Sequence, residues 1–493
     1  MAAQLDQPRN KTLRTCIRLA FVFCLLISTS RLFAQAIPTD IKDAALELRD
    51  AAMQDSIAYD VVESLTMEVG PRSAGSAGDA AAVQWAVKKL NSLGFERVHA
   101  DTVEVPHWDR GTLDVRINAP YAQSLVATSL GGSVGTPHEG VEAPIVRVAS
   151  LAELRALTSE QLQGRIAYID HVMERAKDGE GYSTAGRIRA CGHVVAAELG
   201  ARATIIRSAG TSTHRVAHTG SMRMNKIPGT IPAVALANAD ADILTYAVNS
   251  GKPVTVRLHS TARELPRVIS ANVIGEVRGS GKLANEIVIL GAHLDSWDLG
   301  TGAIDDGAGV AIVTAAAKLI LDSGHRPRRT IRVVLYANEE FGLSGAESYA
   351  TNHRSKIEDH VVGLEADFGD GAVWEFSSRV AEDALDIIDE LHTLLEDIGI
   401  ERGDNEADGG ADLTPLRKAG MPVLSMTQDG THYFDYHHTV DDTLDKIDRD
   451  DLNQNVAAYV TAAYVAANIE RDFGRLPIDT SEKTCAAEFD GDD

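Results

Sequence analysis

The chain has 493 residues, of which 44% are hydrophobic and 24% are charged, and its formal net charge is -24. This apolar content is enough to bury a core, which excludes a chain that is disordered throughout, and the length favours two or three domains. The excess of acidic residues would repel nucleic-acid phosphates, so we expect no nucleic-acid partner. Four cysteines in a chain of this length cannot form a disulfide scaffold.

Residues 1–36 are typical of a secretory signal peptide. A basic segment from Arg9 to Arg18 precedes an apolar run from Leu19 to Ile27, and Ala34-Gln-Ala36 is a small-x-small cleavage site. A membrane-spanning helix needs about 20 apolar residues, which this run does not reach, so we expect no stable membrane anchor. The predicted location of the mature protein is therefore secreted or periplasmic.

Two cysteines, Cys191 and Cys485, remain after this cleavage. Export would permit a disulfide between them. The sequence does not establish it, because Cys191 lies in a helical pattern and Cys485 in an acidic tail, residues 481–493.

Residues 37–111 predict helices followed by a strand: Asp79–Leu93 has helical spacing of apolar residues, and Val98–Val105 has an extended pattern. Residues 112–265 differ, because short β-rich runs surround a single predicted helix, Thr184–Leu199. We interpret them as a compact β-rich insert. The runs are Ala143–Val148, Arg165–Ile169, Ala203–Ile206 and Pro253–Leu258.

Residues 266–480 alternate between apolar strands and helices, which predicts an α/β sheet sandwiched by helices. With residues 37–111 they would form one discontinuous domain. The predicted strands are Glu286–Leu290, Thr330–Leu335, Val361–Leu364 and Pro422–Ser425, and the predicted helices are Val310–Leu321, Ala381–Ile398 and Leu452–Ile469.

Polar side chains follow three of these strands at the point where each ends. His293 and Asp295 follow the first, Glu339 and Glu340 the second, and Asp367 the third. Ligands bind outside the carboxyl ends of strands in open α/β sheets, so these side chains should converge in one crevice. Asp305, which precedes a buried helix, and His438, which follows the fourth strand, would complete the group.

So many carboxylates cannot share a crevice in ionised form without positive charge. A pair of divalent metal ions would supply it, and the mixture of imidazole and carboxylate favours two Zn²⁺. A consistent arrangement has Asp305 bridging the two ions. His293 and Asp367 would bind one ion, and Glu340 and His438 the other.

Glu339 is left over in this arrangement and is the candidate general base. Asp295 could accept the second imidazole N–H of His293 and fix its tautomer. His437, Tyr436 and His218 are candidates for contact with substrate, on proximity to the motifs alone. Any one acidic pair at a strand end is usually just a solvated loop, so the hypothesis depends on the coincidence of all the groups.

The motifs in which these residues lie resemble those of the M28-type zinc exopeptidases, namely GAHLDSWDLGTGAIDDGAG, NEEFG, GLEADFG and HHTVDDT. The resemblance implies the same five zinc ligands, Glu339 as the base, and a cis peptide bond between Asp305 and Asp306. It also implies that the β-rich insert, residues 112–265, is a protease-associated (PA) domain, and it suggests a homodimer. Residues 404–412 and 427–435 match the family only loosely, which leaves the side-chain preference open.

The sequence therefore predicts an exported dizinc metallo-exopeptidase acting on dipeptides or short peptides. Attack by a hydroxide that bridges the metals, with Glu339 as base, is the expected mechanism. One alternative is an aminopeptidase acting on longer peptides. Others are an inactive receptor-like binding protein of the same fold and a zinc acyltransferase that forms N-terminal pyroglutamate, which the complete ligand set disfavours. The metal used in vivo and the oligomeric state stay open.

Overall fold

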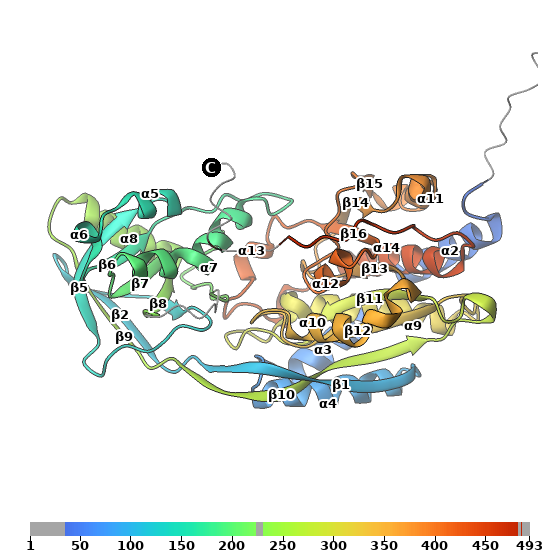
Figure 1. Ribbon diagram of the computed structural model, residues 1–493, viewed down its shortest axis with the longest axis horizontal. Helices are drawn as coiled ribbons and strands as arrows, with labels where there is room; N and C mark the ends of the chain where they lie inside the picture. The colour runs from blue at the N-terminus through green and yellow to red at the C-terminus, as the bar shows by residue number, and fades with distance from the viewer. Residues whose placement is uncertain (1–34, 223–229, 482–484, 486–493) are drawn as a thin grey trace, which may run out of the picture.

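The computed structural model describes residues 35–222, 230–481 and 485, and these form two lobes, each built around an eight-stranded mixed sheet (Figure 1). The predicted signal peptide and acidic tail lie almost entirely outside the described residues. We call the lobe with residues 37–109 and 263–480 the large lobe and the lobe between them the small lobe.

The sheet of the large lobe has four parallel strands at its centre, β12, β11, β13 and β16. They coincide with the four strands predicted from the sequence. Antiparallel neighbours, which were not all predicted, extend the sheet on both sides. In spatial order the strands are β1 (Glu96–Asp109), β10 (Arg263–Val277), β12 (Thr330–Tyr336), β11 (Ile287–His293), β13 (His360–Glu365), β16 (Val423–Gln428), β14 (Val373–Arg379) and β15 (Glu401–Arg402).

Helices cover both faces of this sheet, which confirms the predicted sandwich. On β11, Val288 and Leu290 pack into the core formed with α9 and α14, while Ile287 and Ile289 pack into the core formed with α10 and α12. Side chains that alternate between two buried faces explain why the strand is apolar throughout. The helices are α2 (Thr39–Ala52), α3 (Ile57–Glu68), α4 (Ala77–Ser92), α9 (Ala308–Asp322), α10 (Ser344–Asn352), α11 (Leu385–His392), α12 (Thr414–Lys418), α13 (Tyr433–Tyr436) and α14 (Arg449–Asn468).

One predicted helix of the large lobe is shorter than expected. The helical pattern from Ala381 to Ile398 forms α11 over Leu385–His392, flanked by 3-10 turns at Glu382–Ala384 and Glu396–Ile398. Further 3-10 turns lie at Gly281–Leu283, Arg354–Asp359 and Leu444–Lys446.

The small lobe is more helical than its sequence indicated. Besides the predicted helix, observed as α7 (Gly181–Glu198), it contains α5 (Leu151–Ala156), α6 (Ser159–Leu162) and α8 (Asn238–Asn249). The expectation of a single helix was wrong. α5 and α6 are too short to show a helical period, whereas α8, with 12 residues, was simply not recognised. In spatial order its strands are β3 (Gln123–Leu125), β2 (Leu113–Ala119), β9 (Thr255–Ser260), β5 (Val141–Val148), β6 (Ile166–Ile169), β7 (Ala203–Arg207), β8 (Ala233–Leu236) and β4 (Ala127–Ser129).

The chain passes between the lobes at the ends of the long antiparallel pair β1 and β10 (Figure 1). β1 ends at Asp109 and β2 begins at Leu113, so the predicted boundary at 111/112 falls in this crossing. β9 ends at Ser260 and β10 begins at Arg263, so the boundary predicted at 265/266 falls in the first residues of β10.

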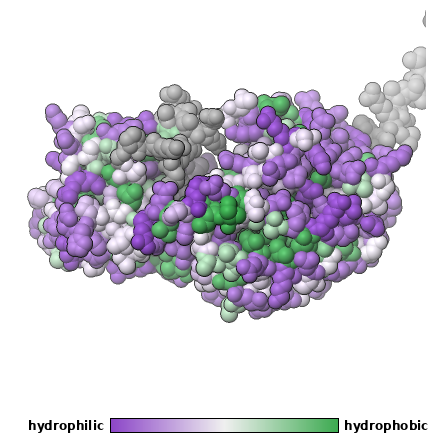
Figure 2. Space-filling view, turned by 60° about the horizontal axis from the view of Figure 1, so that its bottom comes forward, coloured by the Kyte–Doolittle hydropathy of each residue, from purple (hydrophilic) through white to green (hydrophobic). Residues whose placement is uncertain are grey.

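A disulfide joins Cys191 of α7 to Cys485, a pairing that the sequence left open. It links the end of the chain to the small lobe. Among the described residues, no helix is both long and apolar enough to cross a membrane. Figure 2 shows that the face toward β1 and β10 is mostly hydrophilic, with apolar residues gathered near its middle.

Candidate metal centre

The polar residues predicted from the sequence meet at the carboxyl edge of the large sheet. His293 is the last residue of β11, the pair Glu339 and Glu340 follows β12, and Asp367 follows β13. Asp305 lies just before α9, and His438 follows α13.

Asp305 lies at the centre of the group, and each of its carboxylate oxygens faces a different set of candidate ligands. Its Oδ1 is 3.0 Å from His293 Nε2, which is also 3.3 Å from Asp367 Oδ1. Its Oδ2 is 3.1 Å from His438 Nε2, which in turn is 3.1 Å from Glu340 Oε2. Two donor groups therefore share a single carboxylate, which is the arrangement needed for a bridged pair of cations.

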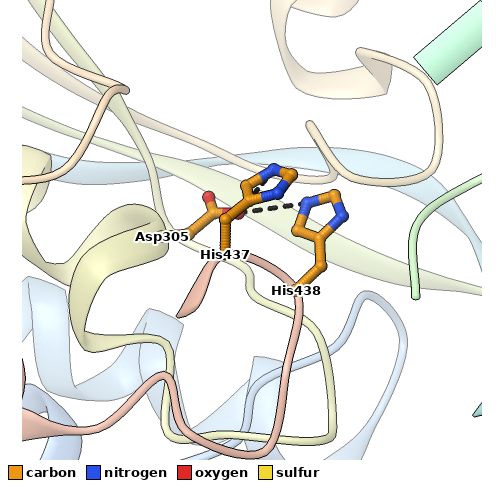
Figure 3. A group of neighbouring side chains, drawn as sticks. All are labelled: Asp305, His437 and His438. Carbon is orange, nitrogen blue, oxygen red and sulfur yellow. Dashed lines mark ion pairs between the residues drawn. The ribbon is translucent and has the colours of Figure 1, made fainter. Parts of the chain in front are cut away.

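His437 also faces this carboxylate (Figure 3), with its Nε2 3.6 Å from Asp305 Oδ2. The rings of His437 and His438 are stacked with centroids 3.5 Å apart. Asp305, His437 and His438 are close enough to hold a metal ion together, so geometry alone leaves His437 as a further candidate ligand. His438 has the additional partner Glu340 and is the better placed of the two.

The loop that carries Asp305 is held by two buried residues that we did not single out from the sequence. Asp442 Oδ1 accepts hydrogen bonds from the backbone N–H groups of Ala303 and Ile304, both at 2.7 Å. The fully buried Arg72 donates to the carbonyl oxygens of Leu294, Thr301 and Gly302 at 2.6 to 2.8 Å. Asp442 lies in the HHTVDDT segment, but no spacing rule indicated which backbone groups it or Arg72 would bind.

The peptide bond between Asp305 and Asp306 is cis, as the family resemblance implied. Asp306 is also close enough to His293 and Asp367 to hold a metal ion with them, but both of its carboxylate oxygens accept backbone N–H groups. Its Oδ2 accepts the His293 N–H at 3.0 Å and its Oδ1 accepts the Gly309 N–H at 2.9 Å.

The predicted contact between Asp295 and His293 differs in detail. His293 Nδ1 lies 3.0 Å from the backbone oxygen of Asp295, whereas the Asp295 carboxylate is 3.7 Å away. That carboxylate instead accepts the backbone N–H of Glu339 at 3.0 Å. Asp295 therefore fixes the imidazole through its main chain and the candidate base through its side chain.

Burial and the repulsion between neighbouring carboxylates raise the pKa values of Glu339, Glu340 and Asp367 above their usual range. Glu340 Oε1 is buried and has no hydrogen-bond partner among the described residues. The group therefore requires positive charge to stay ionised. Its imidazole nitrogens and carboxylate oxygens are donors that Zn²⁺ accepts, so the residues fit this ion.

A cavity of about 420 Å³ adjoins the cluster, and we call it the central cavity. The large lobe contributes Glu339, Glu340, Asp367 and both histidines to its lining. The small lobe contributes Tyr182 and Arg189 from α7. Arg189 Nη1 donates to the Tyr182 hydroxyl at 2.7 Å, while its Nε is buried and has no hydrogen-bond partner in the described part of the chain. The helical pattern gave no indication that Arg189 faces the site, because the packing of the two lobes decides it.

Two of the residues predicted to contact substrate, Tyr436 and His218, are not among the described lining residues of the central cavity. Tyr436 lines a neighbouring cavity, where Lys446 Nζ lies 5.4 Å from the centre of its ring. His218 is buried beneath the His437 loop, with its Nδ1 2.8 Å from the His437 carbonyl oxygen. Burial lowers the pKa of His218 to about 4, so the neutral ring can donate to that carbonyl. His437 does line the central cavity.

Comparison with known proteins identifies the class. Residues 272–463 match the model of peptidase family M28. Carboxypeptidase Q of Rattus norvegicus is 33% identical over 432 residues, which cover 87% of this chain and 89% of the relative. A crystal structure of a peptidase M28 precursor from Shewanella amazonensis SB2B is 49% identical, with a TM-score of 0.87 over 89% of this chain and 99% of that chain. A zinc aminopeptidase from Bacillus subtilis shares the fold, with a TM-score of 0.62 at 20% identity over 86% of this chain and 98% of that one.

The fold and the matched relatives are those of a metallopeptidase. The chain belongs to peptidase family M28.

Proposed function

We propose that this chain is a dizinc exopeptidase that hydrolyses dipeptides or short peptides. The observation that carries the proposal is the division of the ligands between the two oxygens of Asp305, beside a cavity that Glu339 also lines.

Two zinc ions would be held by the residues around Asp305. One ion would have His293 and Asp367 as its further ligands, and the other would have Glu340 and His438. Bound zinc would lower the pKa of a water molecule and polarise the carbonyl of the scissile bond. The name of the Bacillus subtilis structural neighbour supports zinc as the metal.

Glu339 is the proposed general base. It lines the central cavity, and its carboxylate has no hydrogen-bond partner among the described residues, so it is free to exchange protons. Its main chain is anchored by Asp295, which limits its movement. Glu339 would take a proton from the attacking water and deliver it to the departing amine.

The position of Arg189 favours a substrate that has a free carboxylate close to the scissile bond. Its guanidinium lines the same cavity as the candidate ligands, and its Nη1 lies 3.5 Å from His438 Nδ1. A guanidinium is suited to a carboxylate because it offers several N–H donors in one plane. A dipeptide presents its carboxylate one residue beyond the scissile bond, which favours a dipeptidase over an aminopeptidase that acts on longer chains.

The test compares a free dipeptide with its N-acetylated form, its C-amidated form and an extended tetrapeptide. We expect efficient hydrolysis of the free dipeptide alone. Equal hydrolysis of the amidated dipeptide and the tetrapeptide would favour the aminopeptidase. No hydrolysis of any of them, together with no bound zinc, would favour the receptor-like protein.

Three further features belong to this proposal. The small lobe is a PA domain inserted into the peptidase domain, residues 1–36 direct export, and two copies associate as a homodimer. Export is supported by the composition of the leader and by the disulfide between Cys191 and Cys485. Mass spectrometry of the secreted protein and sedimentation would test cleavage after Ala36 and the dimer.

A further inference from the structure

A second cavity, of about 400 Å³, lies beside the central cavity, and we call it the side pocket. The two cavities share Asp367, Phe368 and Ala411 as lining residues. The rest of the side pocket is formed by Asp178, Glu365 and residues 408–410 and 425–428. Of these, residues 408–410, 427 and 428 belong to the segments that match the family only loosely.

The side pocket has an acidic lining. Asp178 and Asp408 are exposed at it, and none of the described residues that line it is basic. Two neighbouring cationic side chains interact with other residues. Lys177 lies over the Trp374 ring, and Arg175 forms an ion pair with Asp435.

Each of the two exposed carboxylates has one oxygen in a local turn and one that is free. Asp178 Oδ1 accepts the Glu180 N–H at 3.1 Å, and Asp408 Oδ1 accepts the Gly410 N–H at 3.3 Å. Within the described residues, the second oxygen of each forms no hydrogen bond or ion pair. These oxygens are therefore available to a ligand.

Gln428 provides an independent indication that the side pocket holds a polar group. Its side chain lines the pocket and is only 2% exposed, yet its amide nitrogen has no hydrogen-bond partner among the described residues. A buried amide without a partner is costly, and a bound polar group would satisfy it. This amide nitrogen is a donor, so it would pair with an oxygen atom of the substrate and not with its cationic side chain, which the two carboxylates would bind.

We propose that the side pocket binds the side chain of the substrate's N-terminal residue and selects a cationic one, lysine or arginine. This inference rests on the proposed peptidase function. Arg189 lies on the His438 side of Asp305, whereas the side pocket lies on the Asp367 side. A dipeptide whose carboxylate meets Arg189 therefore directs its N-terminal residue toward the side pocket.

The experiment measures kcat/KM of the zinc-loaded enzyme for three matched dipeptides, lysyl-alanine, norleucyl-alanine and glutamyl-alanine, and for their sequence-reversed forms. Norleucine matches the lysine chain without its charge. We expect kcat/KM for lysyl-alanine to be roughly tenfold higher than for norleucyl-alanine, and kcat/KM for glutamyl-alanine to be the lowest. The reversed dipeptides should show no such order. Raising the ionic strength should reduce the lysine preference, because the carboxylates are exposed.

The variants Asp178→Asn and Asp408→Asn each remove one charge and retain the oxygen that accepts the turn N–H. Each should reduce the ratio of lysine to norleucine about threefold to fivefold, and the double variant should bring the ratio near one. Asp43→Asn, in the exposed face of α2, removes the same charge far from the pocket and should leave the ratio unchanged.

A ratio near one between the kcat/KM values for lysyl-alanine and norleucyl-alanine in the unmodified enzyme would overturn the inference. A double variant that keeps the preference for lysyl-alanine would overturn it as well. A lysine preference confined to the C-terminal residue would overturn the assignment of the pocket. In each of these cases the dipeptides are still hydrolysed, so the proposed function would stand. Failure to hydrolyse any dipeptide would instead contradict the proposed function.

Discussion

The Nδ1 atom of His438 lies 3.3 Å from the backbone carbonyl oxygen of Thr219, a residue of the small lobe. The Thr219 N–H in turn donates to the His438 carbonyl oxygen at 2.9 Å. A carbonyl acceptor at Nδ1 leaves Nε2 deprotonated and available to a metal. The small lobe therefore fixes the tautomer of a candidate ligand that belongs to the large lobe.

Arg110, at the crossing between the lobes, holds the Thr219 loop. Its Nη1 donates to Thr219 Oγ1 at 3.1 Å and to the Ser129 carbonyl oxygen at 2.5 Å, and its guanidinium pairs with Asp298. We predict that Arg110→Ala lowers the affinity for the more weakly bound zinc ion about tenfold. Outer-shell partners of metal-bound histidines typically contribute 10–100-fold to metal affinity. Competition with a chelator measures this. Arg116→Ala, at an exposed position of β2, is the control, and unchanged zinc affinity in Arg110→Ala would contradict the role.

Arg189→Gln removes the cation that we assign to the substrate carboxylate. We predict that KM for free dipeptides rises ten- to a hundredfold, since a charged hydrogen bond contributes about 1.5–3 kcal/mol. A C-amidated dipeptide has no carboxylate to lose, so its slow hydrolysis should change little. Steady-state kinetics on the matched pair measures the difference. Arg202→Gln, exposed in the same lobe, is the control, and equal losses for both substrates would argue against the assignment.

Glu339→Gln keeps the size of the proposed base and removes its ability to accept a proton. We predict that kcat falls at least 10³-fold while the zinc content is unchanged, because Glu339 is not among the candidate ligands. Metal analysis and kinetics on the same preparation separate the two effects. Substantial remaining activity in Glu339→Gln would contradict the assignment of Glu339 as the base. Loss of zinc from this variant would show that Glu339 acts as a ligand.

Asp370 should make stability depend on pH. Burial raises the pKa of this carboxyl to about 7, and its Oδ2 accepts the Asp448 N–H at 2.6 Å. A raised folded-state pKa means that the stability from this group is present below about pH 4 and is lost as the pH rises through 7. Asp370→Asn keeps the acceptor and cannot ionise. Its advantage in unfolding free energy over the unmodified protein should therefore be larger at pH 8 than at pH 5, by on the order of 2 kcal/mol. Urea unfolding at both pH values measures it, and an equal difference at both would refute the prediction.

The sequence predicted the centre of the large lobe well for a physical reason. β11, β12, β13 and β16 are buried on both faces and therefore read as continuous apolar runs, and parallel strands bring their carboxyl ends to one edge. His293, Glu340 and Asp367 could consequently be grouped without coordinates.

The features that the sequence did not predict depend on contacts between distant segments. Helical periodicity identified α7, but only the docking of the lobes directs Arg189 into the central cavity. Cys191 and Cys485 are 294 residues apart, and nothing local indicates their pairing. Tyr436 is adjacent to the histidine pair in sequence but lines another cavity, so proximity in sequence was a poor guide to substrate contact.

The central claim is that two zinc ions share Asp305. Anomalous diffraction from crystals of the zinc-loaded protein, recorded on both sides of the zinc absorption edge, tests it most directly. We predict two anomalous peaks that flank the Asp305 carboxylate, one beside His293 and Asp367 and the other beside Glu340 and His438. A single peak at full zinc loading, or peaks that do not contact Asp305, would contradict the account.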